Sequence, residues 1–194
     1  MALPQIETAR KTEAAVRKKL ESFGLTVTDA KRNSGADFLV TNQLHPDKVA
    51  RIQVKGRNPG IVKTFRWFQL RVTKGQLKFA HDCGLPPEEA WKKKVRDADF
   101  FVLHAVVPEE MWVLSQDQAF ELILLNEQQY GDRPDNVFTY VKPFQNKQKE
   151  MNLEAHVEGM PIIERFLDCR NNFKPILNFL GISEAGINDL SEIL

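Results

Sequence analysis

The sequence lacks the features that mark several specialised classes of protein. It contains only two cysteines, Cys83 and Cys169, without the paired spacing of metal ligands, so we expect two small buried thiols in a reducing compartment. No apolar run approaches the ~18 residues of a membrane span, and the N-terminus shows no charged-then-apolar signal pattern. Repeats, low-complexity segments and helicase or ATPase motifs are also missing. These absences predict a cytoplasmic, prokaryotic-type protein without a targeting signal or a membrane partner.

The overall composition is that of an ordinary globular protein, but its charge is unevenly distributed. Hydrophobic residues make up 42% and charged residues 27% of 194 residues, enough for one domain with a full core or one domain with an appendage. Residues 1–82 hold 16 Lys+Arg against 7 Asp+Glu (+9), and residues 83–194 hold 11 against 19 (−8). A basic half suits a polyanionic partner such as nucleic acid, and a merely solvated basic surface fits the charges equally well.

Hydrophobic periodicity and turn signals predict a mixed α/β protein. The expected helices cover 6–23, about 73–83, 88–97 and 115–126, the last opened by a capping box of Ser115 and Gln118. The expected strands cover 25–29, 36–41, 49–56, 61–72, 98–107, 111–114 and 137–141, with a polar loop through His45-Pro46-Asp47. From about residue 152 the pattern is helical, with interruptions at Pro161 and Pro175. The sequence thus predicts an α/β core over 1–126, a central mixed sheet flanked by helices, and a mostly helical C-terminal extension over 127–194 for dimerisation or target recognition.

Two of these strands carry polar side chains where apolar ones are expected. Asp37 opens the first strand, and Gln53 and Lys55 end the second. Because side chains alternate between the faces of a strand, Gln53 and Lys55 share one face. Antiparallel pairing then brings Asp37 beside them. The sequence therefore predicts a carboxylate, an amide and an ammonium clustered at one end of a sheet.

The first helix supplies a second carboxylate to this cluster. At ~100° per residue, Glu13 falls inside the apolar stripe of the helix, whereas Glu7 and Glu21 fall outside it. A buried carboxylate costs free energy unless it is paired or liganded, so we expect Glu13 to face the same surface. Carboxylate and carbonyl oxygens suit Mg²⁺ or Mn²⁺ rather than zinc. A cation there would activate a water near a phosphodiester, and Lys55 would orient that water or neutralise charge on the phosphorus centre.

Glu13, Asp37 and the run Gln53-Val54-Lys55-Gly56-Arg57 together resemble the PD-(D/E)XK nuclease superfamily. The gap of 24 residues between Glu13 and Asp37 resembles that of archaeal Holliday-junction resolvases. The Gln-X-Lys variant is similar to that of the intron-encoded homing endonucleases of the same superfamily. The resemblance covers residues 6–73 and extends toward 126.

This resemblance implies a restriction-endonuclease-like core and a Mg²⁺- or Mn²⁺-dependent DNA endonuclease acting on duplex or branched DNA. By analogy Asp37 is the central metal ligand, and Gln53 is a second ligand beside the backbone carbonyl of Val54. Glu13 becomes an accessory ligand and Lys55 the catalytic lysine. A homodimer is expected, because cutting both strands needs two sites.

The chain departs from the family pattern in two places. Ala36 replaces a proline that carries no chemistry. Gln53 replaces a commoner acidic residue, which removes a negative charge and weakens cation affinity. The alternative function is therefore a catalytically weak or inactive nucleic-acid-binding module of the same fold, and a third is a pure interaction scaffold.

Other polar residues near the motif have both functional and structural interpretations. The cations that follow the motif are expected phosphate contacts or a solvated strand face: Arg57, Lys63, Arg66 and Arg71. Alternatively, Asp37 is a cap, Gln53 and Lys55 form the wet face of an edge strand, and Glu13 pairs with an arginine. His104 lies in the most apolar strand and is expected in the core.

Overall fold

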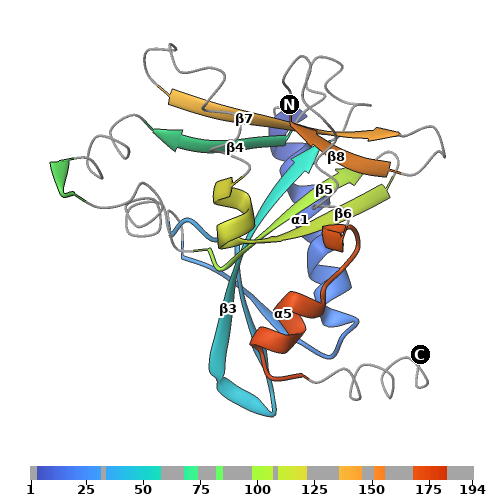
Figure 1. Ribbon diagram of the computed structural model, residues 1–194. Coiled ribbons are helices and arrows are strands. Elements are labelled where there is room, and N and C mark those ends of the chain that lie inside the picture. Colours follow the sequence, from blue (N-terminus) through green and yellow to red (C-terminus); the bar gives the residue numbers. More distant parts are fainter. Residues whose placement is uncertain are drawn as a thin grey trace.

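A computed structural model describes residues 4–31, 34–57, 68–73, 82–84, 98–106, 109–121, 136–145, 151–155 and 168–182. The named elements are α1 (Pro4–Glu21), β1 (Thr26–Asp29), β2 (Phe38–Asn42), β3 (His45–Arg57), β4 (Phe68–Thr73), β5 (Phe100–Val106), β6 (Glu109–Ser115), β7 (Asn136–Gln145), β8 (Met151–Ala155) and α5 (Lys174–Phe179). Their arrangement is shown in Figure 1. The expected α/β class is confirmed.

A five-stranded mixed sheet forms the centre of the described structure. Its strand order is β1-β2-β3-β5-β6. The β3–β5 pair is parallel, with Ile52 opposite Phe100, and the other pairs are antiparallel. The expected antiparallel pairing of the Asp37 strand with the Gln53–Lys55 strand is therefore confirmed, and β3 is an inner strand rather than an edge.

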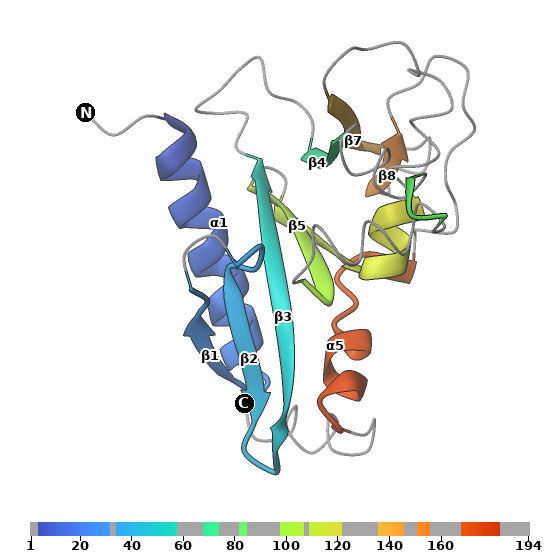
Figure 2. The same cartoon turned by 90° about the vertical axis from the view of Figure 1, so that its left-hand side faces the viewer.

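One face of this sheet is covered by α1 and α5 (Figure 2). Val16 and Leu20 of α1 are fully buried and belong to the same apolar cluster as Ile176 and Leu177 of α5. The strands contribute alternate residues to this cluster: Phe38, Val40, Ala50, Ile52, Val54, Phe100, Val102, Met111 and Val113. Burial of this apolar face favours folding through the hydrophobic effect.

The opposite face of the sheet has its own buried residues around the helical segment 116–121. They are Phe101, Leu103, Trp112, Leu114, Ala119 and Phe120. The predicted capping box is confirmed, because the amide of Ser115 donates to Gln118 Oε1 (2.9 Å) and the amide of Gln118 donates to Ser115 Oγ (3.2 Å).

The turn between β2 and β3 differs from the predicted loop. His45, Pro46 and Asp47 belong to β3, and the turn is confined to residues 43–44. The reason is a register shift between Thr41 and Asn42, where the Asn42 side chain accepts a hydrogen bond from the Leu44 amide (3.1 Å). An Asx turn of this kind closes the chain early.

The C-terminal part of the chain contains strands where a helical pattern was expected. The segment Met151–Ala155 is a strand that pairs with β7, and β7 pairs with β4 in a second, three-stranded sheet. The helical prediction is therefore wrong there. Pro175 does not interrupt a helix but lies in the first turn of α5, where its missing N–H costs nothing. The boundary at residue 126 stays a prediction, although α5 packs in the same core as α1.

A short strap at 168–171 covers the outer edge of β6. The Arg170 guanidinium donates to both carboxylate oxygens of Glu110 (2.9 and 2.7 Å), and the Asn171 side chain donates a third hydrogen bond to it (3.1 Å). The Asn171 amide also donates to the Met111 carbonyl (2.6 Å), and Trp112 and Arg170 form an isolated antiparallel bridge. The strap thus satisfies part of an edge that would otherwise be open.

The predictions for single residues have mixed outcomes. Cys169 is buried as expected, but Cys83 is exposed in the turn 82–84, so its prediction is wrong. His104 is 2% exposed, which confirms its core position. None of the helices in the described ranges has the length and apolar character to cross a membrane. The helices predicted at 73–83 and 88–97 fall almost wholly outside the described residues.

Candidate metal and phosphate site

Asp37 lies where β2 begins and is bound to β3 through both its backbone and its side chain. Its amide donates to the Ile52 carbonyl (2.8 Å), and its Oδ2 accepts a hydrogen bond from the Val54 amide (2.6 Å). Phe38, the first residue of β2, pairs with Ile52, and no described strand pairs with this edge of β3 beyond that point. Because the polar groups of alternate residues point to the same side of a strand, the Val54 carbonyl faces the side where Asp37 lies.

Gln53 and Lys55 share one face of β3, as the alternation predicted. Their neighbours Ile52 and Val54 are buried in the core under α1, whereas Gln53 and Lys55 are half-buried. Continuing the β2–β3 register past Phe38 places Asp37 opposite Gln53. Within the described part of the chain, the Gln53 amide makes no hydrogen bond, so its oxygen is available to a ligand.

Glu13 reaches this end of the sheet because α1 packs very close to β3. A Cβ atom at Gly56 would lie 2.2 Å from Thr12 Oγ1 and 2.7 Å from Thr12 Cβ, which leaves room for glycine alone. The Thr12 hydroxyl is directed back into its own helix, where it donates to the carbonyls of Thr8 and Ala9. The contact fixes the helix turn that carries Glu13 beside the end of β3.

The electrostatics link Glu13, Asp37 and Lys55 into one cluster. Burial raises the pKa of Glu13, and the Asp37 and Asp29 carboxylates raise it further, against the opposing effect of Lys55 and Arg17. Burial lowers the pKa of Lys55, against the opposing effect of Asp37 and Glu13. Both shifts favour the neutral forms of the side chains. Keeping these groups here costs stability, which is typical of functional sites.

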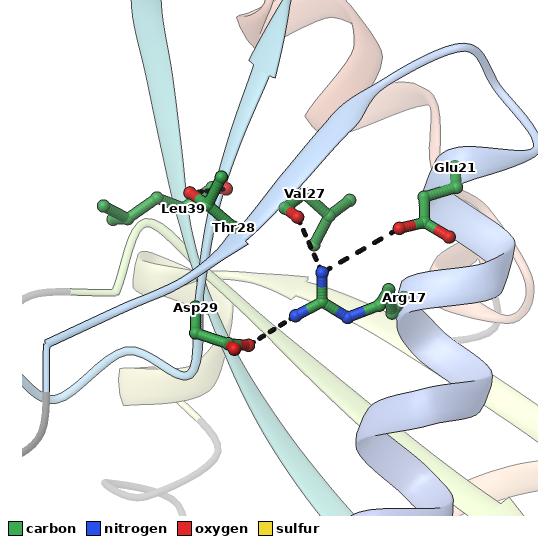
Figure 3. A network of polar contacts seen from close by, with 6 residues as sticks. All are labelled: Arg17, Glu21, Val27, Thr28, Asp29 and Leu39. Carbon is green, nitrogen blue, oxygen red and sulfur yellow. Dashed lines mark hydrogen bonds and ion pairs between the residues drawn. The ribbon is translucent and has the colours of Figure 1, made fainter.

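Arg17, one helical turn after Glu13, connects the cluster to β1 (Figure 3). Its guanidinium donates to the Val27 carbonyl (2.6 Å) and to the Asp29 carboxylate, and it lies over the Phe38 ring, 4.8 Å from the centroid. The sequence pattern did not identify Arg17 or Asp29. The four-residue spacing from Glu13 could have identified Arg17. Asp29 comes close to the cluster only because β1 pairs with β2 in this register.

The structure supports one of the two purely structural interpretations of Glu13 and Asp37 in part, and does not support the other. Glu13 forms no ion pair with any residue in the described ranges, so the interpretation as a salt-bridge partner of an arginine is not supported. Asp37 does act partly as a cap, because it satisfies the Val54 amide. Its Oδ1 accepts no hydrogen bond from the described residues and remains free for a ligand.

The oxygen atoms of this cluster fit a hard divalent cation in type but offer little charge. Glu13 and Asp37 contribute carboxylates, and Gln53 and the Val54 carbonyl contribute neutral oxygens. No group of three or more His, Cys, Asp or Glu residues suited to hold a metal occurs in the described ranges. That result is consistent with a glutamine at position 53, since an acidic residue there would be the third.

No family model, no curated protein and no solved structure matches the chain.

The side chains of the four expected phosphate contacts lie outside the described part of the structure. Lys63 and Arg66 lie outside the described residues, and only the backbones of Arg57 in β3 and Arg71 in β4 are described. Their role in phosphate binding stays a prediction.

Proposed function

We propose that this chain is a divalent-metal-dependent DNA endonuclease with a core of the PD-(D/E)XK type. The observation that carries the proposal is the convergence of Glu13, Asp37 and Lys55 at the open end of β2, where each changes the pKa of another. Such clusters are concentrated at functional sites, because ion pairs that serve stability alone are arranged to favour the charged forms.

In this proposal Asp37, Gln53, Glu13 and the Val54 carbonyl would hold one Mg²⁺ or Mn²⁺. Such a cation would supply Lewis-acid chemistry to a phosphodiester and lower the pKa of a bound water. Asp37 would bind the cation through Oδ1, because Oδ2 accepts a hydrogen bond from the Val54 amide. Glu13 is presented by the helix turn that Thr12 and Gly56 fix against β3.

Lys55 acts on the substrate rather than on the fold. The carboxylates of Asp37 and Glu13 act on its ammonium electrostatically, and an anionic phosphate would offer it a further partner. It would donate to a non-bridging phosphate oxygen or orient the attacking water, which stabilises charge that develops in the transition state. Cleavage of both strands requires two such sites, so we propose a homodimer on DNA.

The decisive experiment is cleavage of plasmid and branched DNA with Mg²⁺ or Mn²⁺ by matched pairs of variants. Asp37→Asn and Lys55→Met should each abolish cleavage while the unfolding transition stays cooperative. Asp47→Asn and Lys48→Met alter the same residue types at the exposed far end of β3, so they should cleave like the unmodified protein. Cleavage that survives Asp37→Asn would overturn the assignment of the site.

A second candidate function is a nucleic-acid-binding module without catalysis. The neutral Gln53 favours it, because a site with two carboxylates binds a cation more weakly than one with three. Salt-dependent DNA binding without cleavage under either metal would support this module. If Gln53→Glu then created cleavage, Gln53 alone would account for the missing activity.

A further inference from the structure

Two arginines flank Glu13 on α1, and the structure uses only one of them. Arg17 follows Glu13 by one turn and is bound to Val27, Asp29 and Phe38. Arg10 precedes Glu13 by one turn and is exposed. In the part of the chain that the structure describes, the Arg10 side chain has no hydrogen bond and no ion pair.

An acidic residue near Arg10 is already committed to another cation. Glu7, one turn before Arg10, pairs with Lys11 (2.8 Å). The positive charges that act on Glu13 are those of Lys55 and Arg17. Among the described residues, the exposed Arg10 side chain therefore has no bound partner.

Arg10 is also on the correct side of α1. At ~100° per residue it lies roughly 60° around the helix from Glu13, whereas Lys18, another exposed cation of the helix, lies roughly 140° away. The first turns of α1 run beside the end of β3 that carries Lys55 (Figure 2). A free guanidinium thus stands one turn from the site, at the end where β3 leaves the sheet.

We infer that Arg10 binds a backbone phosphate of the DNA strand that enters the site, next to the phosphodiester held by Lys55. A guanidinium presents paired N–H donors that match phosphate oxygens. Such a contact positions the strand and carries no sequence information. This inference rests on the proposed function, and it adds a cation that the sequence motif does not include.

Binding of a labelled DNA duplex, measured by fluorescence anisotropy without divalent metal over a series of salt concentrations, tests the inference. Arg10→Gln should weaken binding about tenfold and lower the slope of log K against log salt by about 1. Lys18→Gln removes the same charge from the other side of the same helix and should change binding less than twofold. Both variants should unfold at the same temperature as the unmodified protein.

Each outcome separates this inference from the proposed function. Equal losses for Arg10→Gln and Lys18→Gln, or no loss for either, would show that Arg10 is not a specific contact while leaving the nuclease proposal intact. Binding without cleavage would reject the nuclease proposal and still report on Arg10. A protein that binds no DNA at low salt would overturn both. Restoration of the salt slope by Arg10→Lys would support a phosphate contact.

Discussion

The carboxylates of Glu110 and Glu13 are both shielded from solvent, but their surroundings stabilise the negative charge to very different degrees. Glu110 is 7% exposed, and its two oxygens accept three hydrogen bonds from Arg170 and Asn171. Burial raises the pKa of Glu13, and the carboxylates of Asp37 and Asp29 raise it further, against the opposing effect of Lys55 and Arg17. The first cluster joins the strap to β6. In the second cluster the charged form of Glu13 is disfavoured. Such unfavourable electrostatics are common at binding and catalytic sites.

The largest effect on stability should come from breaking the satisfied cluster. Glu110→Ala removes the carboxylate that accepts hydrogen bonds from Arg170 and Asn171, and with it three of the hydrogen bonds that join the strap to β6. Since Arg170 is one-third exposed (33%), we expect a loss of about 3 kcal/mol, at the low end for a broken buried pair. Urea unfolding at pH 7 measures it. A loss below ~0.5 kcal/mol, the range of surface substitutions, would mean that the strap contributes nothing.

A second test moves α1 relative to the unbalanced cluster. Gly56→Ala introduces a Cβ that would meet Thr12 at 2.2 Å, so the helix must shift, at a cost of about 2 kcal/mol for overpacking. Gly24→Ala is the matched control. Gly24 has a φ of +71° with nothing within 4 Å of a new Cβ, so only backbone strain of about 1 kcal/mol applies.

DNA cleavage by the two glycine variants tests whether the Gly56–Thr12 contact positions Glu13. If DNA cleavage is present, Gly56→Ala should reduce it and Gly24→Ala should not, because only the first displaces Glu13. Thr12→Ala combined with Gly56→Ala should recover part of the lost stability, since it removes the two closest atoms, Oγ1 and Cγ2. Equal losses of activity for both glycine variants would count against a positioning role for the contact.

His104 extends the comparison to a buried base that lacks a hydrogen-bond partner. Neither ring nitrogen accepts or donates a hydrogen bond within the described residues, and the exposed Glu109 is 3.8 Å away. Burial lowers the pKa of His104 below 6.5, so the unfolded chain binds more protons as the pH falls through 6.5. The folded state should therefore lose about 1 kcal/mol between pH 7 and pH 5.5.

The measurement is the free energy of unfolding against pH for the unmodified protein and for His104→Leu. The variant should have a flatter profile over this range, whatever its absolute stability. Parallel profiles would show that His104 is not the group responsible.

The smallest expected effect is a gain in stability. Because the folded state raises the pKa of Glu13, it disfavours the charged form at neutral pH. Glu13→Gln should stabilise the protein by about 0.5 kcal/mol at pH 7, and the gain should vanish once the pH falls below the pKa of the free carboxyl. The same variant should weaken Mn²⁺ binding in isothermal titration. A loss of stability at pH 7 would contradict the unbalanced electrostatics of the cluster.

The sequence predicted the pairing of β2 with β3 and the faces of the β3 residues better than it predicted the C-terminal half. The alternation of Ile52, Gln53, Val54 and Lys55 assigns their faces because strand periodicity is local. Helical phase selected Glu13 for the same reason. Asp29 was missed because its place depends on which residue of β2 pairs with β1, and no local pattern encodes that register.

The same physics explains the errors elsewhere. The early turn after β2 depends on one Asn42 side chain bonding to the backbone, which composition cannot reveal. Met151–Ala155 becomes a strand by pairing with β7, so tertiary contacts override a weak local preference there. Cys83 is exposed in the turn 82–84, whereas Cys169 lies within the strap and is buried.

The parallel pairing of β3 with β5 has a consequence for how the protein is made. Arg51 and Asp99 are 48 residues apart in the chain, yet Asp99 accepts hydrogen bonds from the Arg51 amide and guanidinium. A ribosome adding residues at 5–20 per second needs roughly 2 to 10 s to supply that partner. During this interval the 13-residue strand β3, with Gln53 and Lys55 already synthesised, has one edge open to any passing strand. The nascent chain is thus most exposed to misassembly just before its central sheet can close.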